Sequence, residues 1–412
     1  MTFDVERIRQ QFPGLARKVG SAPAIFFDGP AGTQVPLSVA EAVSHYLLHQ
    51  NANHGGLFAT SVESDAVLDE ARLAAADLFG ITDAQEIVFA ANMTTATFHL
   101  SRAIAQTWLP GDEILLSDSD HDANFTPWKL ASRDSGASVG QIHLRHDDTT
   151  LDLDDLRRKI SPRTKLVAVG AASNASGTIH DVAEIARIAH DVGAIVYVDA
   201  VHYTPHALVD AVSWQADFVV ASAYKFFGPH AAILWGKRPW LERLPAYKVR
   251  PASHALPDRW MTGTPAAENI AGTLAAINYL ADLGRTTDPS AGTRRKAIVS
   301  AMREIATYER SLAKRMLEGL VRKGYRVWGI TDSARLEERV PTFSITHPDP
   351  KWLPINLAKH LADQGIFVWH GNFYAQPFTE ALGVDEHGLV RIGLVHYNTA
   401  EEVDRLIEGL PD

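Results

Sequence analysis

Short apolar runs and amphipathic helical stretches alternate along the first two thirds of the chain. The runs are β-branched and apolar on both faces, which is typical of strands covered by helices on both sides. The helical stretches 65–79 and 182–191 each place their apolar residues on one face, and a glycine, Gly80 or Gly193, follows closely. This alternation predicts an α/β fold with a mostly parallel central sheet. The expected strands lie at 86–89, 113–116, 165–169, 194–198, 217–220 and 232–235.

The pattern changes after about residue 285 to an α+β layout. A long charged helix is expected first, and shorter strands and helices follow it, near 292–323, 342–346, 354–364, 366–369, 389–395 and 400–409. We therefore predict a large domain over residues 21–285 and a smaller C-terminal domain over 286–412. The N-terminal segment 1–20 is expected to pack with the smaller domain.

Composition and charge narrow the class of protein. The 412 residues are 46% apolar and 21% charged, which is a normal globular balance. The net charge of −10 makes a general nucleic-acid binder improbable, and the basic cluster at 294–296 is interpreted as a solvated helix start. The charged N-terminus lacks the apolar core of a signal peptide, and no apolar stretch is long enough to span a membrane. A soluble, cytoplasmic protein is expected.

The sequence contains no cysteine. This excludes disulfides, cysteine-ligated zinc, iron–sulfur ligation and a thiolate nucleophile. It also excludes any reaction that stores sulfur on a cysteine side chain of this sequence.

Polar clusters follow five of the predicted strands, and the most informative one contains Lys225. Lys225 closes the segment Ser222-Ala-Tyr-Lys225, where a buried strand emerges among aromatic residues. Partial burial lowers the pKa of a lysine and favours the neutral amine that Schiff-base chemistry requires. The alternative is an ordinary surface lysine just past a strand.

A second cluster places Asp199 at the end of a fully apolar strand. A buried carboxylate needs a cationic partner, and a protonated pyridine nitrogen would serve. The alternative is an aspartate that caps the next helix. His202 and His206 have metal-ligand spacing, but Pro205 lies between them and no carboxylate completes a ligand set, so no metal site is expected.

The remaining clusters are His121 within residues 118–124, the segment Asn92 to Thr95 at a helix start, and a polar turn over 173–178. Hydroxyls and free amides at a helix start favour an anion or phosphate. A loop histidine and a threonine cap are the alternatives. Because the ends of parallel strands meet at one sheet edge, the clusters together predict a site for an aromatic, phosphorylated cofactor held through a lysine imine.

The whole set of motifs resembles the fold-type I enzymes of pyridoxal 5′-phosphate (PLP), specifically the class V aminotransferase and cysteine desulfurase group. The resemblance runs from Phe3 to the C-terminus. Its motifs are Phe27-Asp-Gly-Pro-Ala-Gly32, Thr94-Thr95, Asp120-His-Asp-Ala-Asn124, Ser173-Asn174 with Gly177-Thr178, Asp199-Ala-Val-His202, Ser222-Ala-Tyr-Lys225, Gly263-Thr264-Pro265, and Arg391 with Tyr397-Asn-Thr399.

The resemblance implies a role for each residue around the cofactor ring. Lys225 would bind PLP covalently and later move the substrate α-proton. Asp199 would pair with the pyridinium nitrogen, and His121 would stack on the ring. Asn174 and His202 would contact the ring hydroxyl, and the family often has glutamine where His202 stands.

The resemblance also implies roles at the phosphate and on the substrate side. Thr94, Thr95, Ser222 and Tyr224 would bind the phosphate, with Tyr224 in place of a more usual histidine. Thr264 would reach the phosphate of a neighbouring subunit, which implies a homodimer with shared active sites. On the substrate side, a carboxylate would be bound by Arg391, with further contacts from His54 and Asn372.

One departure from the family changes the expected reaction. Desulfurases carry a persulfide-forming cysteine on a mobile loop before the final strand, and here that region reads Trp369-His-Gly-Asn-Phe-Tyr374. We therefore expect a PLP enzyme acting on a small amino acid or its derivative, as a carbon–sulfur β-lyase or a desulfurase-like enzyme without a persulfide. A class V aminotransferase, an amino-acid racemase or epimerase, and a non-catalytic PLP-binding regulatory protein are the alternatives.

Overall fold

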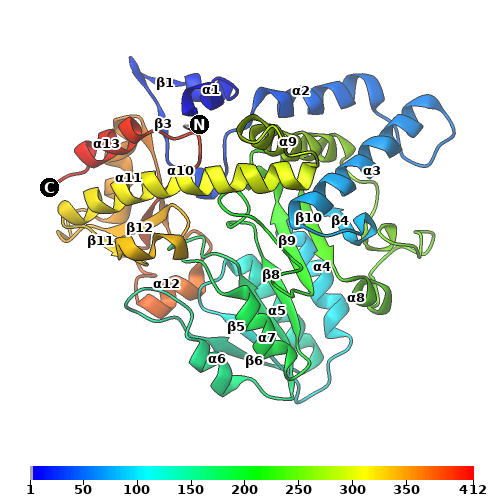
Figure 1. Ribbon diagram of the computed structural model, residues 1–412. Helices are drawn as coiled ribbons and strands as arrows, with labels where there is room; N and C mark the ends of the chain where they lie inside the picture. Colours follow the sequence, from blue (N-terminus) through cyan, green and yellow to red (C-terminus); the bar gives the residue numbers. More distant parts are fainter. Residues whose placement is uncertain (1–2) are drawn as a thin grey trace.

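A computed structural model describes residues 3–412. Its central sheet has seven strands in the order β4-β10-β9-β8-β7-β5-β6 (Figure 1). Strands β6, β5, β7, β8 and β9 are parallel to one another, and β10 is antiparallel to both of its neighbours. The predicted mostly parallel α/β sheet is confirmed. The strands are β4 Ile87–Ala90, β5 Glu113–Ser117, β6 Ser138–Ile142, β7 Thr164–Gly170, β8 Ile195–Asp199, β9 Phe218–Ser222 and β10 Ala232–Gly236.

Strand β6 is the one strand of this sheet that the apolar pattern did not indicate. It lies at the edge of the sheet, and four of its five residues are exposed or half-buried. An edge strand with one covered side does not need a continuous apolar run, so Ser138, Gly140 and Gln141 leave little signal in the sequence.

Successive side chains of a strand point to opposite faces of the sheet. Here both faces are buried, each by its own set of helices. In β8, Val196 and Val198 belong to one apolar cluster, whereas Ile195 and Tyr197 belong to another. The first cluster includes residues of α3 (Ala59–Phe79), α7 (Val182–His190) and α9 (Ala267–Thr287). The second includes residues of α4 (Met93–Ala105), α5 (Thr126–Ser135) and α8 (Arg238–Arg243).

A smaller antiparallel sheet has the order β11-β12-β15-β14. It shares a third apolar cluster with α10, α11 and α13. These elements are β11 Arg326–Trp328, β12 Thr342–Thr346, β14 Trp369–Gly371, β15 Leu389–Gly393, α10 Arg294–Arg322, α11 Pro354–Asp363 and α13 Ala400–Gly409.

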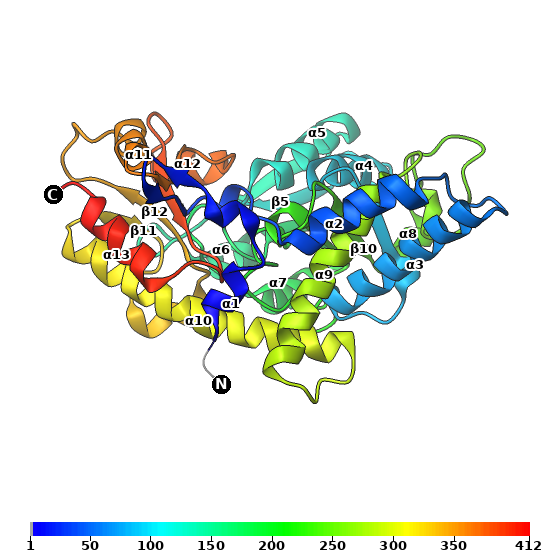
Figure 2. The ribbon, with the colours of Figure 1, turned by 90° about the horizontal axis from the view of Figure 1, so that it is seen from above.

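Helix α10 runs past both sheets (Figure 1), with α9 beside its first half and α13 beside its second half (Figure 2). Residues 297–305 of α10 contribute to the large cluster, and residues 312–320 contribute to the cluster of the small sheet. The change of pattern near residue 285 falls at the end of α9. We propose the domain boundary there.

The N-terminal segment contacts both regions, and residues 1 and 2 of the predicted segment 1–20 lie outside the described residues. Phe12 packs edge-on against Phe227 and Tyr279, whereas Arg9 pairs with Glu402 of α13 at 2.9 Å. Strand β3 then pairs with β13 in parallel. The remaining elements are α1 Val5–Arg9, β1 Lys18–Val19, β2 Ala22–Pro23, β3 Ile25–Phe26, α2 Leu37–His45, α6 Leu153–Lys159, β13 Ile366–Phe367 and α12 Gln376–Leu382.

Among residues 3–412, no helix is long and apolar enough to cross a membrane. Within the same residues there is no group of three or more histidine or acidic side chains arranged to hold a metal ion.

Candidate active site

The loops that follow β4, β5, β7, β8 and β9 surround one cavity. This cavity lies at the carboxyl edge of the sheet, where open α/β sheets bind ligands. Most of the residues predicted for the cofactor site line it. The lining residues are Asn92, Met93, Thr94, Asp120, His121, Ala123, Gly170, Ala172, Asn174, Asp199, Val201, His202, Ser222, Tyr224 and Lys225.

Lys225 lies in a short 3₁₀ turn directly after β9. The two phenylalanines that follow, Phe226 and Phe227, are fully buried and fix this turn in the core. The Lys225 Nζ donates a hydrogen bond to the Pro30 carbonyl. Burial, and next the charge of Arg391, lower the pKa of Lys225 to about 7. A large fraction of this lysine is therefore the neutral, nucleophilic amine at neutral pH.

Asp199 is the last residue of β8 and is buried. Its Oδ1 accepts a hydrogen bond from the Val201 amide at 2.8 Å. Burial raises the pKa of this carboxyl to about 6, and Lys225 opposes the shift. No basic side chain among residues 3–412 forms an ion pair with it, so a cation from outside the chain would complete the site.

Asp120 is a second buried carboxyl beside Asp199. Burial, and next the neighbouring Asp199 charge, raise the pKa of Asp120 well above its usual range. Its Oδ2 has no hydrogen-bond partner within the described chain. The sequence places this residue in a motif but indicates no role for it.

His121 and Asn174 lie on the same cavity. The His121 Nδ1 accepts a hydrogen bond from the Ala123 amide at 3.0 Å, which places the proton of the neutral ring on Nε2. Burial lowers the pKa of His121 to about 3, so the ring is neutral and free to stack. Asn174 donates from Nδ2 to the Phe373 carbonyl at 3.0 Å, and its buried Oδ1 has no partner in residues 3–412.

His202 is buried beside β12 of the small sheet. Its Nε2 lies 3.0 Å from the Thr342 hydroxyl, and its ring meets the His206 ring edge-on at 5.5 Å. Burial lowers the pKa of His202 well below its usual range, so this side chain is a neutral hydrogen-bonding group. His206 in turn pairs with Glu309 of α10 at 2.8 Å.

The start of α4 and the end of β9 form another part of the cavity wall. Asn92 caps α4 by accepting the Thr95 amide at 2.8 Å. Thr94, Ser222 and Tyr224 line the cavity here, and the N-terminus of a 13-residue helix suits a phosphate. Thr95 lies on the exposed side of the first turn and is not among the lining residues.

A second cavity of about 700 Å³ opens outward from the first. The two share six residues, among them His121, Tyr224 and Lys225, so Lys225 lies at the junction of the two cavities. The outer cavity is also lined by residues of the 3₁₀ turn Gly29–Ala31, of α4, α5 and β14, and of the loop after β14. It contains two residues predicted for the substrate, Arg391 and Asn372.

Arg391 lies in the middle of β15 and is buried. One of its terminal nitrogens, Nη1, donates to the Asn174 carbonyl at 2.9 Å, and its guanidinium lies 4.4 Å from the centre of the Phe373 ring. Its Nε has no partner in the described chain. Burial lowers the pKa of Arg391 to about 9, which still leaves a cation at neutral pH. This geometry suits a carboxylate.

Asp28 is a second functional candidate, besides Asp120, for which the sequence indicated no role. Burial raises the pKa of its carboxyl to about 6, and the positive charges of Arg391 and Lys225 oppose this shift. Its Oδ1 has no hydrogen-bond partner among residues 3–412. In the sequence, Asp28 stands between Phe27 and Gly29 in a family motif. That local pattern could not show that its side chain lies near Lys225 and Arg391, which are nearly 200 and more than 360 positions away.

Two predicted residues, His54 and Thr264, lie away from these cavities within one protomer. His54 is exposed, and its Nδ1 lies 3.9 Å from Asp65. Thr264 lines a separate hollow formed by the end of β4, the residues before β10 and the start of α9. The chain alone does not bring either residue to Lys225.

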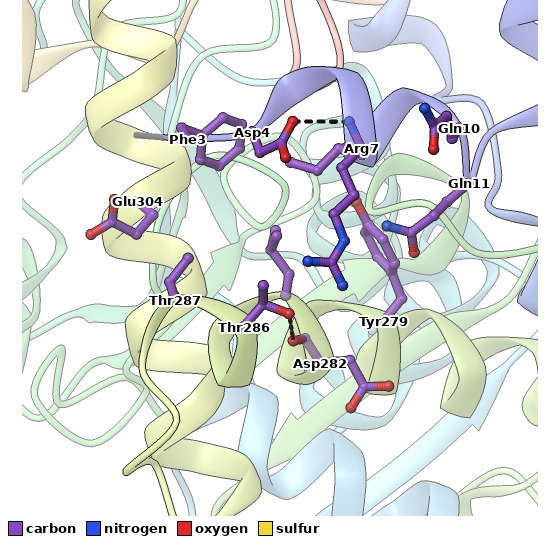
Figure 3. A pocket seen from close by; sticks show the side chains of 12 residues that line it. Phe3, Asp4, Arg7, Gln10, Gln11, Tyr279, Asp282, Thr286, Thr287 and Glu304 are labelled. Carbon is purple, nitrogen blue, oxygen red and sulfur yellow. Dashed lines mark hydrogen bonds between the residues drawn. The ribbon is translucent and has the colours of Figure 1, made fainter. Parts of the chain in front are cut away.

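A further hollow of about 770 Å³ lies between α1, α9 and α10. Figure 3 shows the Arg7 side chain extending from α1 toward α9, with Glu304 of α10 at another side. Neither a lysine nor a histidine is found among the described residues that line it. The acid–base and nucleophilic groups are concentrated in the two cavities around Lys225.

The observed side chains fit PLP. The inner cavity offers a neutral lysine, an unpaired buried carboxyl for a pyridinium, a neutral histidine ring for stacking and a helix N-terminus for a phosphate. The unpartnered Oδ1 of Asn174 leaves an acceptor for a ring substituent. Each polar part of the cofactor therefore has a complementary group.

Comparison with known proteins agrees with this fit. The family model for class V aminotransferases matches residues 25–406. A probable cysteine desulfurase of Vibrio cholerae is 30% identical and covers 100% of this chain and 98% of its own. An aminotransferase-like protein of Gibberella zeae, FGM3, is 30% identical over 99% of this chain and 98% of its own. The solved cysteine desulfurase of Thermococcus onnurineus is 28% identical, with a TM-score of 0.86 over 99% of this chain and 97% of its own. This chain belongs to the class V aminotransferase family of PLP-dependent enzymes.

Proposed function

We propose that this enzyme is a carbon–sulfur β-lyase, or a desulfurase-like enzyme without an enzyme persulfide, acting on a small amino acid or its derivative. The observation that carries the proposal is an intact lysine and arginine site in a sequence without any cysteine. Sulfur cannot be stored on a cysteine of this sequence, so it must leave on the substrate fragment or as sulfide.

Arg391 binds the substrate carboxylate through two parallel hydrogen bonds in this proposal. Its guanidinium is oriented by the Asn174 carbonyl and the Phe373 ring, so the arginine is preorganised before the substrate arrives. The carboxylate then lies beside Lys225, which lines the same cavity. The substrate α-carbon is thereby brought near the lysine amine.

Lys225 takes the proton from the α-carbon. Its pKa near 7 suits a base that must accept and return a proton at neutral pH. PLP, when bound, supplies an electron sink that stabilises the resulting carbanion. Asp199 holds a proton at the ring nitrogen and so strengthens that sink.

The carbon–sulfur bond then breaks, and the electron pair leaves with sulfur. A proton on sulfur gives a thiol, or sulfide when the substrate is cysteine. Water hydrolyses the unsaturated amine that remains to pyruvate and ammonia. No oxidant or reductant is needed.

The test is to incubate the purified PLP-loaded enzyme with L-cysteine or S-methyl-L-cysteine. We expect pyruvate and sulfide, or pyruvate and methanethiol, in equal amounts. Alanine with elemental sulfur would indicate the desulfurase-like form of the proposal. A keto acid that retains sulfur, or a D-amino acid, would instead indicate transamination or racemisation. No conversion of any amino acid would favour the regulatory alternative.

Lys225→Ala is the matched control. We expect it to abolish turnover while PLP still binds without covalent attachment, which mass measurement after borohydride reduction can show. Full turnover in this variant would refute the assignment of Lys225.

We also propose a homodimer with shared active sites. Support comes from an apolar surface around the α2–α3 connection, where Leu57 is fully exposed and Leu48 and Phe58 are largely exposed. An apolar surface of this kind is typical of a protein–protein interface. His54 lies in the same connection, so a second copy could bring His54 and Thr264 to the cavity of its partner.

A further inference from the structure

The outer cavity has two zones of different chemistry. Its inner end is polar and contains Lys225, Arg391 and Asn174. Its outer walls carry four aromatic side chains from three elements, namely Phe98, Trp369, Phe373 and Tyr374. The volume of about 700 Å³, whose inner end PLP on Lys225 would share, is in the range of pockets that enclose drug-sized ligands.

The aromatic wall is held in an unusual backbone conformation. Phe373 and Tyr374 have φ values of 58° and 56°, in the left-handed region that bulky residues rarely adopt. Such strain persists where surrounding contacts determine the conformation, and it is concentrated at functional sites. Glycine or asparagine would be the ordinary choice at such positions, so an aromatic residue there carries a conformational free-energy cost.

Three hydrogen bonds fix the loop. The Asp122 amide donates to the Tyr374 carbonyl at 2.6 Å, and Asn174 Nδ2 donates to the Phe373 carbonyl at 3.0 Å. The Tyr374 amide donates to Asn372 Oδ1 at 3.1 Å. The loop is therefore hydrogen-bonded to the segments that contain Asp122 and Asn174, and it forms a fixed wall of the outer cavity.

The ring orientations continue this wall toward the reacting groups. The Phe373 ring lies against Arg391, and the Tyr374 ring is nearly parallel to His121, at an interplanar angle of 17° and 5.6 Å between centroids. Tyr374 is 72% exposed and Trp369 is 52% exposed, so much of each ring is free of protein contacts within the chain. Phe98 contributes a further ring from α4.

From this arrangement we propose that the enzyme selects amino acids whose sulfur carries a flat aromatic or heteroaromatic group. The inference rests on the proposed lyase function and specifies its substrate class. Arg391 binds the carboxylate, and the aryl group lies among the four rings. The same carbon–sulfur bond breaks, and the electron pair and one proton leave with the aryl thiol.

Binding is tested without the reaction. The probes are 3-(phenylthio)propanoate and 3-(methylthio)propanoate, which keep the carboxylate and lack the amino group that reacts with the cofactor. Their dissociation constants for the PLP-loaded enzyme are measured by calorimetry. We expect the phenyl probe to bind at least about tenfold more tightly, because its ring can stack with more than one of the four aromatic side chains. Equal binding of the two probes would overturn the proposal.

Tyr374→Ala and Tyr374→Phe form a matched pair. Because Tyr374 is largely exposed, neither variant removes a core side chain. The alanine variant should lose most of the preference for the phenyl probe, and the phenylalanine variant should keep it. Trp369→Ala provides a second exposed site in the wall. An unchanged preference in both alanine variants would contradict the inference.

Turnover of S-phenyl-L-cysteine and S-methyl-L-cysteine separates this inference from the proposed function. Tight binding of the phenyl probe with no thiol release from either substrate would refute the lyase function alone. Efficient cleavage of the methyl substrate without a phenyl preference in binding or in kcat/KM would refute the substrate class alone.

Discussion

At the scale of single residues, the properties of Lys225 are determined by its neighbours. Burial and Arg391 lower its pKa, whereas Asp199 and Asp28 oppose that shift. The ordinary lysine pKa is 10.5, and here it is about 7. Asp28 and Arg391 therefore act on the reactivity of the lysine as well as on any ligand. Substituting each of the two residues separately tests the effect of its charge on the Lys225 pKa.

The first prediction concerns the rate at which PLP-free enzyme binds PLP covalently. Only the neutral amine reacts, so the rate should rise with pH up to about 7 and level off above it. Asp28→Asn removes a negative charge that raises the Lys225 pKa, so the midpoint should move to lower pH. Arg391→Met removes a positive charge, so its midpoint should move to higher pH.

Mass measurement after borohydride reduction at each pH gives the fraction attached. Arg391→Lys retains the positive charge and is the control, with a midpoint closer to that of the unmodified enzyme than the Arg391→Met midpoint. A midpoint near 10 in the unmodified enzyme would show that the lysine is not perturbed.

At the scale of secondary-structure elements, α10 joins the two apolar cores and carries a buried carboxyl group between them. Glu309 and His206 are each almost fully buried, and their side chains are 2.8 Å apart. Burial raises the pKa of Glu309, and the His206 contact opposes the shift. This pair ties α10 to the segment that positions His202.

We predict that Glu309→Ala lowers the free energy of unfolding by about 3 kcal/mol, because it leaves His206 buried without its partner. Glu309→Gln keeps the size and a hydrogen bond and should cost less. The control is Glu318→Ala on the same helix, where an exposed pair with Lys314 spans 4.0 Å and should contribute less than about 1 kcal/mol. Urea unfolding measures all three variants, and equal losses for Glu309→Ala and Glu318→Ala would contradict the prediction.

At the scale of the whole molecule, two residues predicted for the active site lie away from the Lys225 cavities of one protomer. His54 and Thr264 lie on surfaces away from Lys225, and the exposed apolar residues near His54 need a covering partner. The proposed second copy of the chain would supply both residues and cover that apolar surface. The expected mass in solution is twice the monomer mass of 45.1 kDa.

Mixed dimers test the shared site directly. Lys225→Ala and Thr264→Glu should each be inactive alone, the second because its negative charge repels the phosphate. Mixing the two variants under conditions that exchange subunits should restore activity, since one of the two sites then has both native residues. No recovery in mixtures that contain mixed dimers would contradict shared sites.

The sequence was sufficient for the parallel sheet, for the long helix α10 and for the family. Buried strands covered on both sides require continuous apolar runs, and the loops after them require polar residues, so both leave local patterns. The edge strand β6 left none because one of its sides is open to water. Lys225, Asp199 and His121 were predictable for the same local reason, since each closely follows an apolar strand.

The tertiary structure decided what the local pattern does not contain. Asp28 approaches Lys225 and Arg391 only because the segment before α2 lies beside both sheets, and its raised pKa depends on that burial. The strained backbone at Phe373 and Tyr374 is determined by hydrogen bonds from Asp122 and Asn174, which are distant in sequence. The sequence by itself therefore determined which chemical groups are available and on which strands they lie. Their distances, charges and the shape of the substrate cavity depend on long-range packing, because burial and electrostatic interactions act through space rather than along the chain.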